Sequence, residues 1–215
     1  MTCRLDWTSV SFSILVIAGT VCAQQAPPSL SSKAASSISI KSALPDPGEI
    51  TNSLYRNPFF GFTCKIPFGW VNRTDEMRQD SGESAKSILM LAVFEHPPEA
   101  TGNTVNSAVV IAAESVSSYP GLTNPAQYFG PLTEVSTAKG LKPVNEPYEF
   151  PVDAKPIVRR DFMKQVGTLA MHQSTLAMLQ KGYVLSFTFI GSSDDEVTAL
   201  IESLAFGKVK GPTHK

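Results

Sequence analysis

Apolar and polar positions alternate most clearly over residues 183–190, near the end of the chain. Every second position carries a large apolar side chain, namely Tyr183, Leu185, Phe187 and Phe189. A period of two predicts a half-buried β-strand. The semi-apolar run 168–179 contains good helix formers. However, the tripeptide 180–182 suits a tight turn, because Gly182 can adopt a positive φ, so a second strand and a hairpin are favoured.

A short helix is predicted directly after this hairpin. Ser193 and Glu196 have the spacing of a capping box, and the acidic residues 194–196 suit the positive end of a helix dipole. Apolar residues then recur at helical spacing, at Val197, Leu200, Ile201 and Leu204. Gly207 stands where a helix C-terminal cap is expected. We therefore expect a helix that includes Leu204 and packs on one face of the hairpin.

Five further strands are predicted upstream of the hairpin. They cover residues 60–66, 87–95, 107–116, 144–152 and 156–163. The second and third are continuous apolar runs, which is typical of strands buried on both faces. Pro67-Phe-Gly-Trp70 predicts a sharp turn after the first strand. Over 71–84 the pattern is charged, and residues 74–78 fit either a helical turn or a loop.

A second helix is predicted to begin at Pro125, with Asn124 as its N-cap. Its apolar stripe is followed by Gly140, which would end it. Pro131 conflicts with this helix, because an internal proline removes a hydrogen bond and clashes with the preceding turn. Consecutive strands with short connections favour an antiparallel sheet with helices on its faces, hence an α+β fold.

The N-terminal region predicts export. Residues 1–23 resemble a secretory signal with an apolar core at 11–21 and cleavage near Ala23. Lipidation at Cys22 is the alternative, favoured less because Val21 fits a lipobox poorly. The stretch 24–49 is rich in Ser, Ala and Pro and predicts a flexible linker. The folded domain is expected over residues 50–208, and a disordered tail over residues 209–215.

Composition narrows the classes of function. The chain has 215 residues, 42% of them hydrophobic, and a net charge of −1. This charge provides no field that would attract nucleic acid, so no nucleic-acid partner is expected. Beyond the signal no apolar segment is long enough to span a bilayer, so no membrane span is expected in the mature chain. Cys64 is the only cysteine after residue 23, which excludes an internal disulfide in the mature protein.

Cysteine and histidine were weighed as candidate catalytic groups. Cys64 with His96 or His172 could form a nucleophile and base pair. Cys64, however, lies in an alternating apolar strand, where a free cysteine usually behaves as a small buried hydrophobe. His172 is expected to be a structural histidine. We therefore expect no catalytic residue and no enzyme activity.

Charged residues give no stronger candidates for a binding or metal site. The acidic run Asp194-Asp195-Glu196 is explained by the helix cap. Arg159 and Arg160 point to opposite faces of a strand, so with Lys164 they are expected to form solvated surface rather than one anion site. Asn72-Arg-Thr74 is a glycosylation sequon only in a eukaryotic source. We assign no metal-binding or cofactor-binding residue, and no cofactor is expected.

Several segments together resemble the PsbP-like superfamily. They are residues 57–70, 126–129, 157–162 and 181–187, and the closing Ser203-Leu-Ala-Phe206. The superfamily includes the photosystem II extrinsic protein PsbP, a Ran-binding nuclear protein and bacterial envelope proteins. The resemblance covers roughly residues 50–208 and implies an α/β/α sandwich with a central antiparallel sheet. It implies binding or assembly rather than catalysis, and it transfers no site residue.

The sequence therefore predicts an exported, non-enzymatic binding or assembly protein, secreted or periplasmic. We expect it to act through the loops 72–86 and 96–106 on another envelope protein or a small ligand. A lipid-anchored envelope assembly factor is one alternative. An enzyme that depends on Cys64 is the other.

Overall fold

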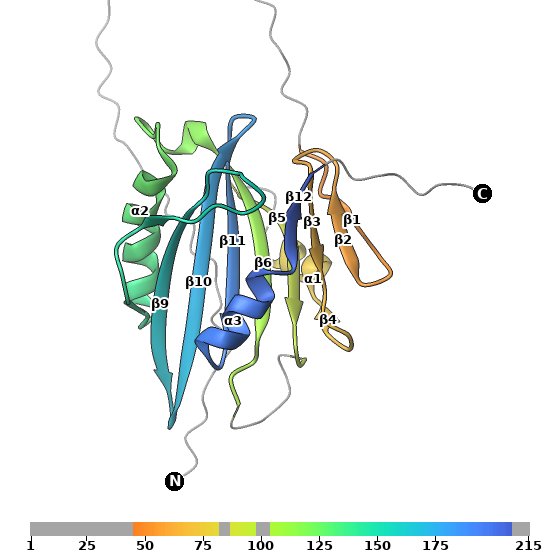
Figure 1. Cartoon of the computed structure of the whole chain (residues 1–215), viewed down its shortest axis with the longest axis vertical. Coiled ribbons are helices and arrows are strands. Elements are labelled where there is room, and N and C mark those ends of the chain that lie inside the picture. The colour runs from red at the N-terminus through yellow and green to blue at the C-terminus, as the bar shows by residue number, and fades with distance from the viewer. Residues whose placement is uncertain (1–44, 82–86, 98–103, 208–215) are drawn as a thin grey trace, which may run out of the picture. The chain divides into compact units, whose positions relative to one another are not determined.

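The computed structural model describes residues 45–81, 87–97 and 104–207 (Figure 1). The predicted signal 1–23, residues 24–44 of the predicted linker and the predicted tail 209–215 lie outside the described residues. From Asp46 onward the chain is held by the domain. The Tyr55 hydroxyl donates to the carbonyl of Pro47 over 2.6 Å, and the Asn57 amide donates to that of Asp46 over 3.0 Å.

An eight-stranded antiparallel sheet is the centre of the domain. Its order is β4-β5-β6-β11-β10-β9-β7, and β8 also pairs with β9. The strands are β4 (Val71–Asn72), β5 (Ser87–Phe94), β6 (Ala108–Ser115), β7 (Lys142–Pro143), β8 (Tyr148–Glu149), β9 (Val158–Val166), β10 (Leu169–Gln180) and β11 (Tyr183–Gly191). The hairpin of β10 and β11 turns at Lys181 and Gly182, with φ of 51° and 80°. The predicted hairpin, including a strand rather than a helix over 168–179, is confirmed.

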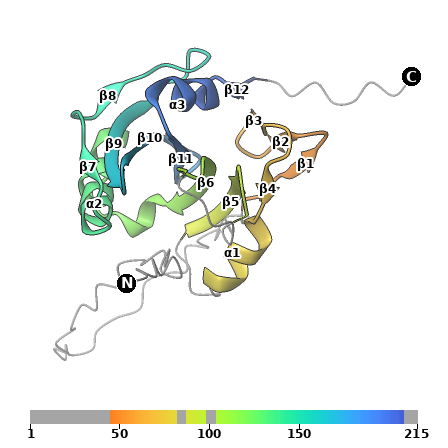
Figure 2. The same ribbon diagram turned by 90° about the horizontal axis from the view of Figure 1, so that it is seen from below.

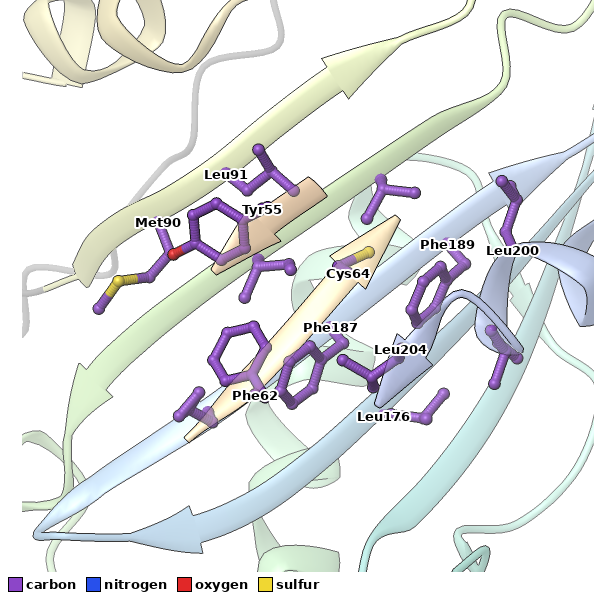
Figure 3. Close-up of a cluster of buried hydrophobic side chains, with 14 of the residues drawn as sticks. Tyr55, Phe62, Cys64, Met90, Leu91, Leu176, Phe187, Phe189, Leu200 and Leu204 are labelled. Atoms are coloured by element: carbon purple, nitrogen blue, oxygen red, sulfur yellow. The ribbon is translucent and has the colours of Figure 1, made fainter. Parts of the chain in front are cut away.

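A second, four-stranded sheet covers one face of the first. Its order is β1-β2-β3-β12. The strands are β1 (Glu49–Thr51), β2 (Leu54–Asn57), β3 (Phe62–Lys65) and β12 (Leu204–Phe206). Figure 3 shows Phe62 and Cys64 of β3 among side chains of the large sheet, and the rings of Phe62 and Phe187 lie 5.1 Å apart. Both rings are fully buried, so the main core lies between the two sheets.

The last helix, α3 (Asp194–Ile201), lies on the same face as the small sheet. It ends three residues earlier than the sequence predicted. Leu204 belongs instead to β12, where it pairs with Cys64 of β3, so its assignment to the helix was wrong. Gly207 follows this strand and caps no helix. Leu204 is apolar because β12 enters the same core as α3. Its position in the sequence happened to continue the helical spacing of the apolar residues in α3.

Helix α2 (Pro125–Ala138) covers the opposite face of the large sheet (Figure 2). Tyr128 and Phe129 are buried against residues from three strands, namely Val158, Ala177 and Val184. The helix begins at the predicted Asn124 cap and continues through Pro131 without ending there. With α3 on one face and α2 on the other, the predicted α+β fold, an α/β/α sandwich with a central antiparallel sheet, is confirmed.

The ambiguous residues 74–78 belong to a helix, α1 (Thr74–Ser81), which protects the edge of β5. The Arg78 guanidinium donates to the carbonyls of Leu89 and Met90 over 2.7 and 3.1 Å. The Thr74 hydroxyl accepts from the amide of Ala92 over 2.9 Å. These contacts occupy backbone groups that an unprotected edge strand would offer to another chain. After β6 a short 3₁₀ helix, Val116–Ser118, leads towards α2.

The predicted strand 144–152 was largely wrong. Only Tyr148 and Glu149 pair with β9, and the chain around them follows an irregular path. A single bridge joins Val152 to Lys155 around the predicted turn, where Asp153 and Ala154 have positive φ. Two prolines, at positions 147 and 151, explain the interruption, because proline supplies no amide donor to a ladder.

Candidate binding groove

An open groove lies between α3 and the turn that follows β3. Its volume is about 490 Å³, which falls within the usual range of about 300–1,000 Å³ for ligand sites. Nine residues line it, namely Lys65, Ile66, Pro67, Trp70, Glu95, Glu196, Ala199, Leu200 and Ser203. They come from three distant parts of the sequence, which the pairing of β3 with β12 and the packing of α3 bring together. We call this feature the α3 groove.

The turn 67–70 forms one rim of the α3 groove. The amide of Trp70 donates to the carbonyl of Pro67 over 3.4 Å, and Gly69 has a φ of 84° that favours glycine. Phe68 at the tip of this turn is 100% exposed. A fully exposed phenylalanine beside an apolar groove is unfavourable for an isolated domain, and such surfaces commonly mark interaction sites.

The opposite wall of the groove is α3, whose first turn is fixed by hydrogen bonds. The Ser193 hydroxyl accepts from the amide of Glu196 over 3.2 Å. The Glu196 carboxylate accepts from the amide and hydroxyl of Ser192, over 2.8 and 2.7 Å, and from the hydroxyl of Ser107. Only half of the predicted capping box therefore forms, since the carboxylate binds Ser192 rather than the Ser193 amide.

The charge of Glu196 is held firmly in the ionised state. Burial raises the pKa of this carboxyl, but the hydrogen bonds from Ser107 and Ser192 outweigh burial and lower it below its usual value. Glu95 contributes a second carboxylate to the lining, and Lys65 contributes the one basic side chain. The lining thus combines an apolar surface with an excess of negative charge.

Cys64 lies within β3 and is fully buried. Its Sγ lies 3.3 Å from the hydroxyl of Ser203, a residue of the groove lining. Burial raises the pKa of the Cys64 thiol to about 11. A thiol with this pKa is protonated at neutral pH and is a poor nucleophile, which disfavours the enzyme alternative.

Neither candidate histidine is paired with Cys64 by any contact of the described residues. His172 Nδ1 lies 2.7 Å from the Asp194 carboxylate, so this histidine ties β10 to the start of α3. His96 is exposed next to Glu95, with 3.8 Å between its Nε2 and the carboxylate. In the acidic run 194–196, Asp194 contacts His172 and Glu196 binds Ser192. In the described ranges, no group of three or more acidic, histidine or cysteine side chains could hold a metal ion.

The expectation that Arg159 and Arg160 are solvated was wrong. Arg160 is buried: it donates to Thr133 Oγ1 over 2.8 Å and to the Asn145 carbonyl over 3.0 Å. Arg159 donates to the Asp161 carboxylate over 2.7 Å. The two residues do point to opposite faces of β9, as predicted. Each face is covered there, however, by α2 on one side and by the 144–150 segment on the other.

Asp161 is the centre of this polar network. Its carboxylate also accepts from Ser174 over 2.5 Å, from Asn145 over 2.6 Å and from Tyr148 over 3.1 Å. Burial raises the pKa of Asp161, but the hydrogen bonds from Ser174, Arg159 and Asn145 outweigh it and lower the pKa. Lys164 donates instead to the Lys139 carbonyl over 2.8 Å. These charges therefore fasten the 139–150 connection to the sheet.

The predicted binding loops are only partly described. In the first, 72–86, residues 74–81 form α1, and 82–86 lie outside the described residues. In the second, 96–106, Asn106 exchanges two hydrogen bonds of 2.9 Å with the backbone of His96, and 98–103 lie outside. The sequon Asn72–Thr74 connects β4 to α1, and the Asn72 side chain accepts from the amide and hydroxyl of Thr74.

Sequence reasoning missed the α3 groove. Its turn was predicted, but Phe68 was not singled out. The available signal was an aromatic residue between Pro67 and Gly69, at a turn position where polar residues are usual. The sequence of α3 does not reveal that this helix lines a groove. Its apolar stripe also supplies buried core residues such as Val197 and Ile201, so the stripe is explained by the core alone.

Comparison with known proteins yields matches of structure only. No protein-family model matches the sequence, and no curated protein matches it. Among solved structures, cyanobacterial PsbP from Synechocystis sp. PCC 6803 matches with 13% identity and a TM-score of 0.48, over 72% of this chain and 91% of that one.

Two bacterial proteins match more loosely. LpqN, involved in cell envelope biogenesis of Mycobacterium tuberculosis, has 16% identity and a TM-score of 0.38, over 74% of this chain and 80% of that one. PA94 from Pseudomonas aeruginosa, a protein of unknown function, has 14% identity and a TM-score of 0.34, over 64% and 81% of the two chains. At these identities no residue role or activity is transferred. In the part of this chain that the structure describes, no helix is long and apolar enough to cross a membrane.

Proposed function

We propose that this protein is an exported, non-enzymatic binding protein that uses the α3 groove to hold an apolar segment of another envelope protein. The observation that carries the proposal is Phe68, which is 100% exposed in the turn whose residues Pro67 and Trp70 line the groove. Export rests on the predicted signal 1–23 with cleavage near Ala23. A partner that covers Phe68 would remove its ring from water, which is worth about 1.5–3 kcal/mol for a residue of this size.

A protein partner fits the groove better than a small ligand does. Sites for small molecules are generally concave enough to bury most of the ligand. The α3 groove is open, and its most exposed apolar residue stands on the rim rather than on the floor. Aromatic residues in this position are typical of protein interfaces, where they act as anchors. The open groove and the projecting Phe68 would then contact one partner together.

Co-purification from the native envelope fraction tests this function. The tagged full chain, its Phe68→Ser variant and a Val144→Ser control are compared. Val144 is a matched control because it is also an exposed apolar residue, 61% exposed, on the segment beside β9. We expect a stoichiometric partner with the wild type and with Val144→Ser, and its loss with Phe68→Ser. Equal recovery with all three proteins would show that the partner, if any, binds elsewhere.

A further inference from the structure

The polar part of the α3 groove has a defined charge. Glu196 is a lining residue, and its carboxylate is fixed at the start of α3 by hydrogen bonds donated by Ser107 and Ser192. Glu95 adds a second carboxylate from the end of β5. Against these two acidic residues, the described part of the lining has one basic residue, Lys65, so the net charge of its described residues is negative.

The apolar part lies directly beside these carboxylates. Ile66, Pro67 and Leu200 offer aliphatic surface, and Trp70 offers an aromatic ring. Long basic side chains fit such a surface, because their alkyl stems pack on apolar atoms while the charged group remains in a polar environment. A tryptophan ring also attracts a cation through the negative face of its π system. Carboxylates next to an apolar and aromatic surface therefore favour lysine or arginine.

We propose that the α3 groove selects a protein segment in which a lysine or arginine neighbours an apolar anchor. This inference rests on the proposed function and specifies the chemistry of its partner. The anchor contacts Phe68 and the apolar floor, and the basic side chain points towards Glu95 and Glu196. Lys65 lies on the same lining, so an acidic residue in place of the basic one would meet two carboxylates and one ammonium group.

An anionic membrane is the competing occupant, because Phe and Trp residues also anchor proteins at lipid interfaces. The charges disfavour it. Anionic lipid headgroups attract clusters of lysine and arginine side chains. The groove instead has two carboxylates beside its aromatic residues, and these would be repelled. A protein segment with a basic residue satisfies both the apolar and the charged part of the groove.

Selection from a phage library of random linear peptides, using the immobilised full-length protein, provides the probe. Clones that bind the wild type but not Phe68→Ser are sequenced, and one peptide is synthesised with a fluorescent label. Its affinity is measured by anisotropy for the wild type, Glu95→Gln and Lys65→Gln. Glu95 is the better acidic site to replace, since the Glu196 carboxylate also accepts the hydrogen bonds from Ser107 and Ser192 that fix the first turn of α3.

We expect the selected peptides to be enriched in lysine or arginine next to a large apolar residue. Glu95→Gln should lower the affinity for the peptide about fivefold, which corresponds to the loss of a partly exposed ion pair worth at most about 1 kcal/mol. Lys65→Gln should leave the affinity unchanged or increase it. The effect of Glu95→Gln should shrink at high salt, because exposed charges are screened.

The outcomes separate this inference from the proposed function. Two results overturn the charge preference alone. One is a set of peptides that depend on Phe68 but lack basic residues. The other is a peptide that binds more weakly to Lys65→Gln than to Glu95→Gln. Failure to recover any peptide that depends on Phe68 overturns the use of the groove and the charge preference with it. Sedimentation with vesicles of phosphatidylcholine and phosphatidylglycerol is the further test. Co-sedimentation that is lost in Phe68→Ser would assign the surface to a membrane instead.

Discussion

Replacement of Asp161 by alanine should destabilise the domain strongly at neutral pH. This carboxylate accepts hydrogen bonds from four side chains, those of Arg159, Ser174, Asn145 and Tyr148. The Arg159 and Asp161 side chains are 13% and 17% exposed, so the pair is largely removed from water. Breaking a buried ion pair by removing one partner costs about 3–5 kcal/mol. Because some solvent reaches this pair, we expect the free energy of unfolding to fall by about 3 kcal/mol.

The loss should depend on pH in a defined direction. The folded state lowers the pKa of Asp161, so the carboxylate contributes stability above its unfolded value, which is about 3.9. That contribution disappears as the pH falls through the lowered folded-state pKa. The difference in the free energy of unfolding between wild type and Asp161→Ala should therefore be largest near pH 7 and narrow below about pH 4.

Urea unfolding followed by circular dichroism at a series of pH values measures both effects. Glu149→Ala is the control, because Glu149 is an exposed carboxylate on the neighbouring strand β8. It should change the free energy of unfolding by less than about 0.5 kcal/mol. A loss for Asp161→Ala below about 1 kcal/mol at pH 7, or a loss that stays constant into acid, would refute this role for the network.

Three further predictions concern the core, the thiol and the exposed turn. Phe62→Ala should lower the free energy of unfolding by about 3–5 kcal/mol, because its ring is fully buried against Phe187; urea unfolding that shows a loss under about 1 kcal/mol would contradict the two-sheet core. Cys64, with a pKa raised to about 11, should not react with an aromatic disulfide reagent at pH 8 until urea unfolds the protein. Rapid labelling of the native protein would reopen the enzyme alternative. Phe68→Ser should change stability by less than about 0.5 kcal/mol, so a large drop in its melting temperature would mean that Phe68 is structural.

Local patterns predicted those parts of the fold that local interactions decide. The β10–β11 hairpin follows from strict alternation and from the Lys181-Gly182 turn, whose two residues adopt the positive φ values that this turn needs. The start of α2 follows from the Asn124 cap and from Pro125. In each case the decisive residues lie within one turn of one another, so the sequence contains the complete signal.

Predictions failed where distant segments decide the structure. Leu204 fits a helical stripe, yet the edge of β3 pairs with it and makes it a strand residue. Arg160 alternates with its neighbours as in any strand, and only the packing of α2 and of the Asn145 region buries it. The α3 groove combines the turn after β3, the end of β5 and α3, which no local pattern connects.

Photo-crosslinking from the turn 67–70 tests the central claim, that the α3 groove with Phe68 is a binding surface. A benzophenone amino acid is placed at Phe68, or at Val144 as a control, in the full-length protein expressed in its native host cells. Both positions are exposed, at 100% and 61% respectively. We predict that irradiation joins the Phe68 position to one defined protein, and that the Val144 position gives no such product. The same products from both positions, or none from Phe68, would contradict the claim.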